Sequence, residues 1–251
     1  MNKPTDYIAS LAKGLRVLEC FGMETARLSV TDVADLTGLD RASARRCLLT
    51  LHTEGYVNYD GKFFEPTTRV LRLGTGALAA LPMPRIVQPW LDQLSERLGE
   101  SVSVSVLDGT EIVYLARAAQ HRIMSIGLMP GSRLPAHCTA MGRVLLASLA
   151  TAEAITLLEQ SDFSPRTVNS KTSVDQIMTE LDEVRRLGFA VVDQETEVGL
   201  RSIAVPLIDS RGRTVAALNS GVAAIQPDAL DLVESLLPEL LRTQSGLKML
   251  L

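Results

Sequence analysis

Residues 28–64, LSVTDVADLTGLDRASARRCLLTLHTEGYVNYDGKFF, decide the fold of the first third of the chain. Apolar residues recur at helical spacing before Gly38, which indicates a short helix with Thr31 as its N-cap. Beyond the Gly38 turn, Asp40 can cap another helix, which extends through Glu54. Its apolar stripe consists of Ala44, Cys47, Leu48 and Leu51. Two amphipathic helices separated by so tight a turn are typical of a helix-turn-helix.

The residues on either side of this pair complete the unit. Upstream, a helix expected over residues 10–21 carries an apolar stripe of Leu11, Leu15, Leu18 and Phe21. Downstream of Gly55, two short strands are expected around the Asp60-Gly61 turn. The strands are expected at residues 56–59 and 62–64. Three helices followed by a hairpin predict a winged helix-turn-helix domain over residues 1–67.

The outward face of the second helix of the pair carries the residues predicted to bind DNA. When the apolar stripe faces the core, 100° per residue turns Arg45 and Arg46 outward, where a major groove can accept both guanidinium groups. Arg41 and Ser43 lie near the start of the helix and are expected to hold phosphates or flanking bases. Lys62 follows the hairpin turn and is expected at the wing tip, over the DNA backbone or minor groove. For the two outward arginines and the lysine, the alternative is an ordinary solvated surface.

Composition limits the class of protein. The chain has 251 residues, of which 46% are apolar and 22% charged, so it is globular and long enough for two domains. Residues 1–75 contain ten Lys and Arg against nine Asp and Glu, whereas residues 76–251 contain fifteen against twenty. This asymmetry places any nucleic-acid contact in the first third. Three cysteines suit a reducing compartment, and the lack of a long uncharged apolar window predicts a cytoplasmic protein without membrane contact.

The rest of the chain alternates between helical and strand patterns. Residues 68–82 are expected to form a linker helix, interrupted by two glycines and closed by proline. Residues 101–106, SVSVSV, alternate strictly and predict a half-buried strand. Further strands are expected at 111–116, 122–129, 189–192, 201–208 and 214–219, and helices at 86–98, 141–149, 151–159, 174–187 and 227–247. This order indicates an α+β domain over residues 83–251, with helices packed on an antiparallel sheet.

An enzyme is the rival class. Cys138 lies near the start of the helix expected at 141–149, where a helix dipole lowers a thiol pKa, and His137 adjoins it. Neighbouring residues on a strand or helix point apart, so His137 is badly placed as a base, and a small buried thiol is the simpler interpretation. The three histidines are too far apart for a local ligand pattern, and no complete glycine-rich phosphate loop occurs. We therefore expect no catalysis, no metal and no cofactor.

Four blocks of sequence together resemble the IclR family of transcriptional regulators. They are SLAKGLRVLECF at 10–21, LSVTDVADLTGLDRASARRCLLTLHTEGYV at 28–57, PGSRLPAHCTAMGRVLLA at 130–147 and VGLRSIAVPL at 198–207. The resemblance covers nearly the whole chain. It implies a winged-helix DNA-binding domain, a linker helix and a GAF-like C-terminal domain that binds a small effector. Within the family, the blocks most resemble the subgroup of PcaR, PcaU and PobR, which controls aromatic-acid catabolism.

The resemblance also implies an effector site over one face of the sheet. Matched position by position, the effector residues would be Ala140, Met141, Asp193, Glu195, Asn219 and Ser220. The free N–H groups at a helix start favour a carboxylate, and Met141 can pack against a ring or an alkyl body. We therefore expect a small organic acid, either an aromatic acid or the keto acid made from it. The alternative is a stand-alone sensor or an enzyme that uses the same pocket.

Assembly can also be predicted. A single winged helix covers about one half-site of DNA, so useful affinity requires a symmetric pair of subunits. The linker offers Leu71, Leu78 and Leu81 for a seam between two copies. We expect a homodimer or homotetramer bound to palindromic, double-stranded operator DNA, as the family resemblance also implies.

Overall fold

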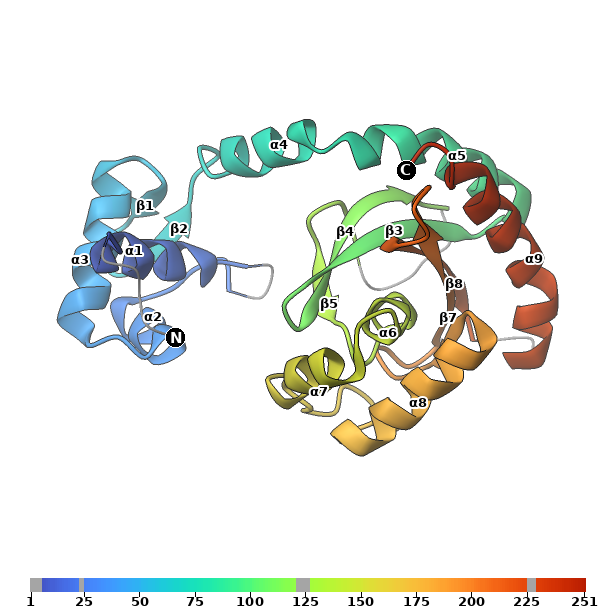
Figure 1. Ribbon diagram of the computed structural model, residues 1–251. Helices are drawn as coiled ribbons and strands as arrows, with labels where there is room; N and C mark the ends of the chain where they lie inside the picture. Colours follow the sequence, from blue (N-terminus) through green and yellow to red (C-terminus); the bar gives the residue numbers. More distant parts are fainter. Residues whose placement is uncertain (1–5, 23–24, 121–126, 225–228) are drawn as a thin grey trace. The chain divides into compact units, whose positions relative to one another are not determined.

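A computed structural model describes residues 6–22, 25–120, 127–224 and 229–251 (Figure 1). The chain divides into two compact units, Met1–Ala80 and Leu81–Leu251. The helix that the sequence predicts as a linker therefore belongs to the first unit, and the helix after it opens the second.

The first unit is a winged helix-turn-helix, as the sequence predicts. Its elements are α1 (Ala9–Glu19), α2 (Val30–Thr37), α3 (Arg41–Thr53), β1 (Val57–Tyr59), β2 (Phe64–Pro66) and α4 (Leu71–Ala80). One core joins the three first helices to the hairpin, and it contains Val17, Val33, Ala34, Ala44, Leu48, Val57 and Phe64. Strands β1 and β2 pair antiparallel to form the wing.

Two local predictions for this unit are wrong. The N-cap of α2 is Ser29 and not Thr31, because the Ser29 hydroxyl accepts from the Asp32 N–H while the Asp32 carboxylate accepts from the Ser29 N–H. Strand β2 begins at Phe64 rather than at Lys62. Asp60 explains that shift, because its Oδ1 accepts hydrogen bonds from the backbone N–H groups of Lys62 and Phe63 and holds both residues in the turn.

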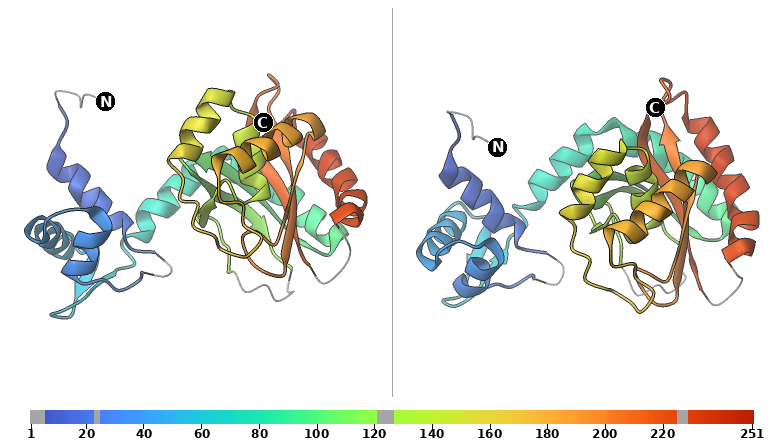
Figure 2. Two further views of the ribbon diagram at one scale, coloured as in Figure 1. Left: turned by 90° about the horizontal axis from the view of Figure 1, so that it is seen from below. Right: turned by 60° about the horizontal axis from the view of Figure 1, so that its bottom comes forward.

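The second unit is an antiparallel sheet with helices on both faces. The sheet order is β5-β4-β3-β8-β7-β6. The strands are β3 (Ser101–Asp108), β4 (Glu111–Ala118), β5 (Arg133–Pro135), β6 (Ala190–Asp193), β7 (Leu200–Ile208) and β8 (Thr214–Ala223). The helices are α5 (Pro82–Leu98), α6 (Ala140–Ala147), α7 (Thr151–Glu159), α8 (Val174–Leu187) and α9 (Ala229–Leu247). Helices α5 and α9 cover one face, and α6 packs on the other with α7 and α8 outside it (Figures 1 and 2).

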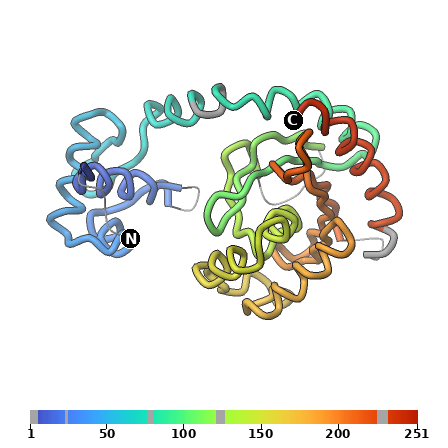
Figure 3. The backbone as a smooth tube through the Cα atoms, viewed as in Figure 1, coloured from blue at the N-terminus to red at the C-terminus, as the bar shows by residue number. Residues whose placement is uncertain are grey.

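The central strand β3 is buried on both faces, so the prediction of a half-buried strand is wrong. Val102 and Val104 pack under α5 and α9, while Ser103 and Ser105 are buried on the α6 side. The cause is non-local, because β3 pairs with the distant β8 as well as with β4, and the chain returns to it only near its end (Figure 3). Serine and valine alternate here because the two faces of the strand meet different buried surfaces, and not because one face is exposed to solvent.

The strand predicted at 122–129 is not found as such. Its residues 122–126 lie outside the described part of the chain, and residues 127–129 form no strand. The outer neighbour of β4 is instead the short β5, which pairs with Glu111–Val113. Across the described ranges, no helix is long and apolar enough to cross a membrane.

Candidate functional site

The surface of α3 presents three arginines. Arg41, Arg45 and Arg46 are all exposed. Ser43 is only 5% exposed, and its hydroxyl accepts a hydrogen bond from Nη2 of Arg46 at 3.2 Å. Ser43, predicted to hold phosphates or flanking bases, is thus largely buried and bonded to Arg46, and its contact with DNA stays a prediction. Asp40 caps the helix as predicted, accepting from the Ser43 N–H at 2.8 Å.

The wing presents Lys62 at its turn. Asp60 Oδ1 accepts from the N–H groups of Lys62 and Phe63 at 2.8 and 2.7 Å, and these bonds lower the pKa of Asp60 to about 2. The Lys62 ammonium is exposed and lies 4.9 Å from the centre of the Phe63 ring. Arg27, which precedes α2, pairs with Asp60 from the other side. The lysine therefore stands on a turn whose backbone is already fixed.

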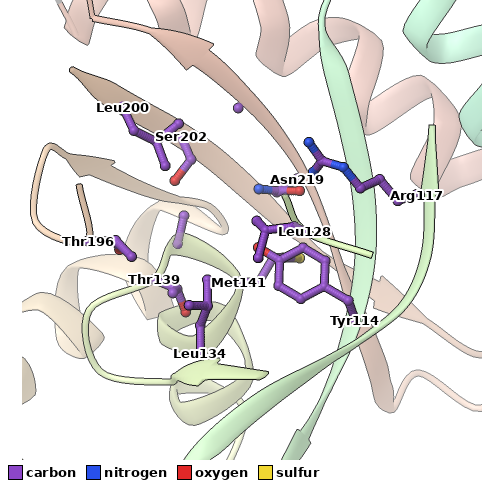
Figure 4. Close-up of a pocket in the computed structure, with 12 residues that line it drawn as sticks. Tyr114, Arg117, Leu128, Leu134, Thr139, Met141, Thr196, Leu200, Ser202 and Asn219 are labelled. Carbon is purple, nitrogen blue, oxygen red and sulfur yellow. The ribbon is translucent and has the colours of Figure 1, made fainter. Parts of the chain in front are cut away.

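A pocket of about 450 Å³ of empty volume, partly open to solvent, lies between the sheet and the start of α6. Figure 4 shows the side chains that surround it. Its lining consists of Tyr114, Arg117, Leu128, Leu134, Thr139, Ala140, Met141, Thr196, Leu200, Ser202, Asn219 and Gly221. Much of this volume is open to solvent, and the space inside that can hold water-sized molecules is about 30 Å³, so a larger ligand requires the lining side chains to move apart. The residues come from β4, β5, β7, β8, the N-cap and first turn of α6, the loop before β7 and, for Leu128, the segment before β5.

Among the described residues that line this pocket, Arg117 is the one with a cationic side chain. Its Nη1 donates to Ser103 Oγ at 3.0 Å, and burial lowers the pKa of the guanidinium. Within the described residues, no carboxylate forms an ion pair with it. Arg117, Ser103 and Asn219 are direct neighbours across three adjacent strands, and in Figure 4 the guanidinium points toward Asn219. A half-buried arginine without a counterion is ready to bind an anion.

A β-bulge brings Tyr114 and Arg117 to the same face of the sheet. Strand alternation places residues three apart on opposite faces. In β4, however, Ala116 pairs with Val104 and Tyr114 with Ser105, so Leu115 is an extra residue. The bulge explains why the period of the sequence gives no signal for these two pocket residues. Arg117 itself is signalled only as a charged residue within an apolar strand.

Two further polar groups of the pocket make no hydrogen bond with the described residues. Asn219 Oδ1 is buried without a hydrogen bond. Tyr114 is 4% exposed, its hydroxyl makes no hydrogen bond within the described residues, and burial raises its pKa to about 12. Both could bond to a polar group of a ligand. Ser220, predicted to join Asn219, faces the other side of the sheet, where its hydroxyl donates to the Ser101 carbonyl at 3.4 Å, because neighbouring strand residues alternate.

The start of α6 is the wall predicted to hold a carboxylate. Ala140 and Met141 line the pocket, as expected, and Thr139 caps the helix by accepting from the Gly142 N–H at 3.1 Å. The backbone at Gly142 is pressed against the chain before it, since a Cβ there would lie 2.0 Å from the Ala136 carbonyl oxygen. Only glycine fits this contact.

The two acidic residues predicted for the pocket are used elsewhere. Asp193 is paired with Arg201 at 2.9 Å, and this hydrogen bond lowers the pKa of Asp193. Glu195 is 3% exposed and is paired with Arg143 at 2.6 Å. Neither lines the pocket. The pairing of Asp193 with Arg201 and of Glu195 with Arg143 depends on the tertiary structure, so no local sequence pattern predicts it.

Cys138 lacks the features of a nucleophile. It is 1% exposed, its Sγ donates to the Pro135 carbonyl at 3.6 Å, and burial raises the pKa of its thiol. His137 beside it has its pKa lowered by burial. Over the residues that the structure covers, no cluster of three or more His, Cys, Asp or Glu could hold a metal ion.

A winged helix-turn-helix joined to a sheet domain that encloses a small-molecule pocket defines a ligand-responsive, DNA-binding transcriptional regulator. Comparison with known families agrees and is more specific. The IclR helix-turn-helix domain matches residues 10–61, and the domain described as bacterial transcriptional regulator IclR C-terminal matches residues 75–242. The chain belongs to the IclR family.

Similar proteins include regulators of aromatic catabolism. The Pca regulon regulatory protein of Pseudomonas putida is 37% identical over 96% of this chain and 84% of its own length. The p-hydroxybenzoate hydroxylase transcriptional activator of Acinetobacter baylyi is 38% identical, covering 97% and 92%. A solved structure of the PobR inducer-binding domain from Acinetobacter, a double mutant with 3-hydroxybenzoic acid, is 31% identical with a TM-score of 0.63, covering 67% of this chain and 98% of that one.

Proposed function

We propose that the pocket of the second unit binds a small organic acid, with Arg117 holding its carboxylate, and that the acid controls operator binding by the first unit. The partly buried Arg117, without a carboxylate partner in the described residues, carries this proposal. A buried cation is unfavourable until an anion reaches it, and a carboxylate can accept two bonds from one guanidinium. An acid therefore gains an interaction that the corresponding neutral amide lacks.

The walls of the pocket suit a flat or extended apolar body. Tyr114, Leu128, Leu134 and Met141 surround its centre, while the unpartnered Asn219 Oδ1 can accept a hydrogen bond from the ligand. According to their names, one relative activates transcription for p-hydroxybenzoate hydroxylase, another regulates the Pca regulon, and the solved PobR domain is in complex with 3-hydroxybenzoic acid. The effector proposed here is accordingly an aromatic acid, or the dicarboxylic keto acid formed from one.

The same proposal assigns the DNA contacts. Arg45 and Arg46 would enter the major groove, Arg41 would hold phosphates, and Lys62 would bind the backbone or minor groove, all from the exposed surface of residues 1–67. Residues 68–82 would connect this domain to the effector domain of residues 83–251.

Assembly into homodimers or homotetramers would place two such domains on a palindromic site. Leu71 and Leu81 support this, because they are 64% and 41% exposed and an exposed apolar side chain gains from burial against a second copy. The side chain of Leu78, predicted with them, lies outside the described part of the chain.

Calorimetry on the full chain tests the effector proposal. 3-Hydroxybenzoate and 4-hydroxybenzoate are titrated beside their amides into the wild-type protein, Arg117→Met and Arg133→Met. Arg133 is a matched control because it lies on β5 but is paired with Asp108 and Glu111. Loss of a charged hydrogen bond, about 1.5–3 kcal/mol, should weaken acid binding about 10- to 150-fold in the Arg117 variant alone. Equal binding of acid and amide, or of wild type and the Arg117 variant, would contradict the proposal.

A further inference from the structure

Beneath the wall of the effector pocket lies a buried cluster of charges. Arg143, in the second turn of α6, is 1% exposed. Its Nη2 meets Glu195 Oε2 at 2.6 Å, its Nη1 meets Glu180 Oε2 at 3.4 Å, and its Nε donates to the His137 carbonyl at 3.0 Å. A guanidinium so buried is stable only while these acceptors remain in place. The arginine therefore fixes the position of whatever carries Glu195 relative to α6.

Glu195 is carried by a pocket wall. It lies in the loop between β6 and β7, and the next residue, Thr196, lines the pocket. Thr196 Oγ1 donates to the Cys138 carbonyl at 2.7 Å, which ties this loop to the segment just before α6. Gln194, which precedes Glu195, has a φ of +57°. The loop is therefore held in a left-handed backbone conformation that residues other than glycine disfavour.

A second loop is joined to the same carboxylate. Lys171, between α7 and α8, places its Nζ 3.2 Å from Glu195 Oε1 and donates its backbone N–H to Oε2. Ser170 donates to the Glu195 carbonyl at 2.7 Å. Glu195 thus connects three pieces of chain, namely α6, the loop 194–199 and the loop that leads into α8.

We infer that Arg143 and Glu195 are positioning residues for the effector. Their ion pair sets the separation between Thr196 and the first turn of α6, two adjoining parts of the pocket wall, without contact with the ligand. The pair can do this because its two partners belong to different elements of the wall, Arg143 to α6 and Glu195 to the loop between β6 and β7. This inference rests on the proposed function, since it concerns the affinity of the same pocket for an organic acid.

The test compares Glu195→Gln with Asp209→Asn in the full chain. Both changes keep the shape of a buried carboxylate and remove its charge. Asp209 is also 3% exposed and is bonded to Arg213 at 2.8 Å, but it follows the opposite end of β7 from the pocket residues Leu200 and Ser202. Thermal unfolding measures the loss of stability in each variant. Calorimetry with 3-hydroxybenzoate and 4-hydroxybenzoate, well below both unfolding midpoints, measures affinity for the acid.

Both variants should unfold at a lower temperature than wild type. Only Glu195→Gln should raise the Kd for the acid, by about tenfold, which equals the effect of losing one hydrogen bond to the ligand. Hydrogen–deuterium exchange should also become faster over residues 194–200 in this variant. The double variant Arg143→Met, Glu195→Gln should recover stability, because no buried charge is left unpaired, without recovering the Kd.

Three results would overturn the inference. A Kd for Glu195→Gln within twofold of wild type would show that the pair is merely structural, as would recovery of the Kd in the double variant. A wild-type protein that binds neither acid would remove the proposed function and this inference with it, so the two failures are distinguishable.

Discussion

Replacing Gly142 by alanine should damage both the stability and the effector pocket of the second unit. The added Cβ would lie 2.0 Å from the Ala136 carbonyl oxygen and 2.4 Å from the Ala136 Cα. Ordinary contacts between such atoms need about 3.5 Å, so the start of α6 must move by roughly 1 Å or more. The atoms in the way belong to the backbone, and no rotation of a side chain can relieve the contact.

The expected cost can be worked from two opposing effects. Overpacking in a core costs about 1–3 kcal/mol, and a backbone contact belongs at the upper end of that range. Alanine regains about 1 kcal/mol through its better helix propensity. The net loss of about 2 kcal/mol should lower the Tm of the second unit by about 4–8 °C, at about 2–4 °C per kcal/mol for a unit of this size.

Differential scanning calorimetry resolves this prediction when Gly74→Ala is measured in parallel. Gly74 lies in helix α4 with no atom within 4 Å of its hypothetical Cβ, so alanine there should be neutral or stabilising. Gly142→Ala should also weaken binding of hydroxybenzoates, because Ala140 and Met141 move with the helix. An unchanged Tm and an unchanged Kd for Gly142→Ala would refute the close-packing argument.

Three other predictions concern the first unit. Arg45→Ala and Arg46→Ala should each weaken operator binding by about 1–3 kcal/mol and reduce the preference for the operator sequence, which footprinting would show. Lys62→Ala should weaken binding to all DNA sequences and reduce the slope of log K against log salt concentration by about 1, which salt titration would show. Asp60 has its pKa lowered to about 2, so its contribution to stability is present above its unfolded value near 4 and is lost as pH falls through the folded value. Acid titration of unfolding should therefore show a smaller pH dependence between about 4 and 2 for Asp60→Asn, and an identical dependence would count against the turn geometry. Sedimentation of Leu71→Glu should show weaker self-association than wild type, and a wild-type protein that remains a monomer with and without DNA would contradict the assembly proposal.

The DNA-binding unit could be predicted from sequence because its signals are local. Asp40 caps α3 three residues before its bonding partner, and Gly38 ends α2 in the left-handed conformation that glycine favours. The true N-cap of α2 can also be predicted from the sequence, because Ser29 and Asp32 have the spacing of a capping box. Such motifs lie within one turn of helix, so the tertiary structure adds little to them.

The effector pocket could be predicted only where it follows a single element. Ala140 and Met141 line the pocket as the sequence predicts, because they start one helix, and their contact with an effector stays a prediction. Arg117 and Tyr114 were missed because a bulge at Leu115 changes the face they share, and bulges depend on the pairing of strands rather than on either strand alone. The sheet pairs residues more than a hundred positions apart, and the hydrophobic periodicity of the sequence contains no information about such pairing.

The pairing of charges around the pocket supports the proposal that the effector is an acid rather than a neutral molecule. Arg143 is neutralised by Glu195 and Arg201 by Asp193, so two nearby cations have counterions within the protein. Arg117 has only the hydroxyl of Ser103 within the described residues. The acidic residues that resemblance assigned to the effector are therefore paired with the neighbouring arginines, and among the described residues that line the pocket Arg117 is the cation without such a partner. An anion that reaches Arg117 completes the pattern of paired charges, and a neutral molecule of the same shape leaves it incomplete.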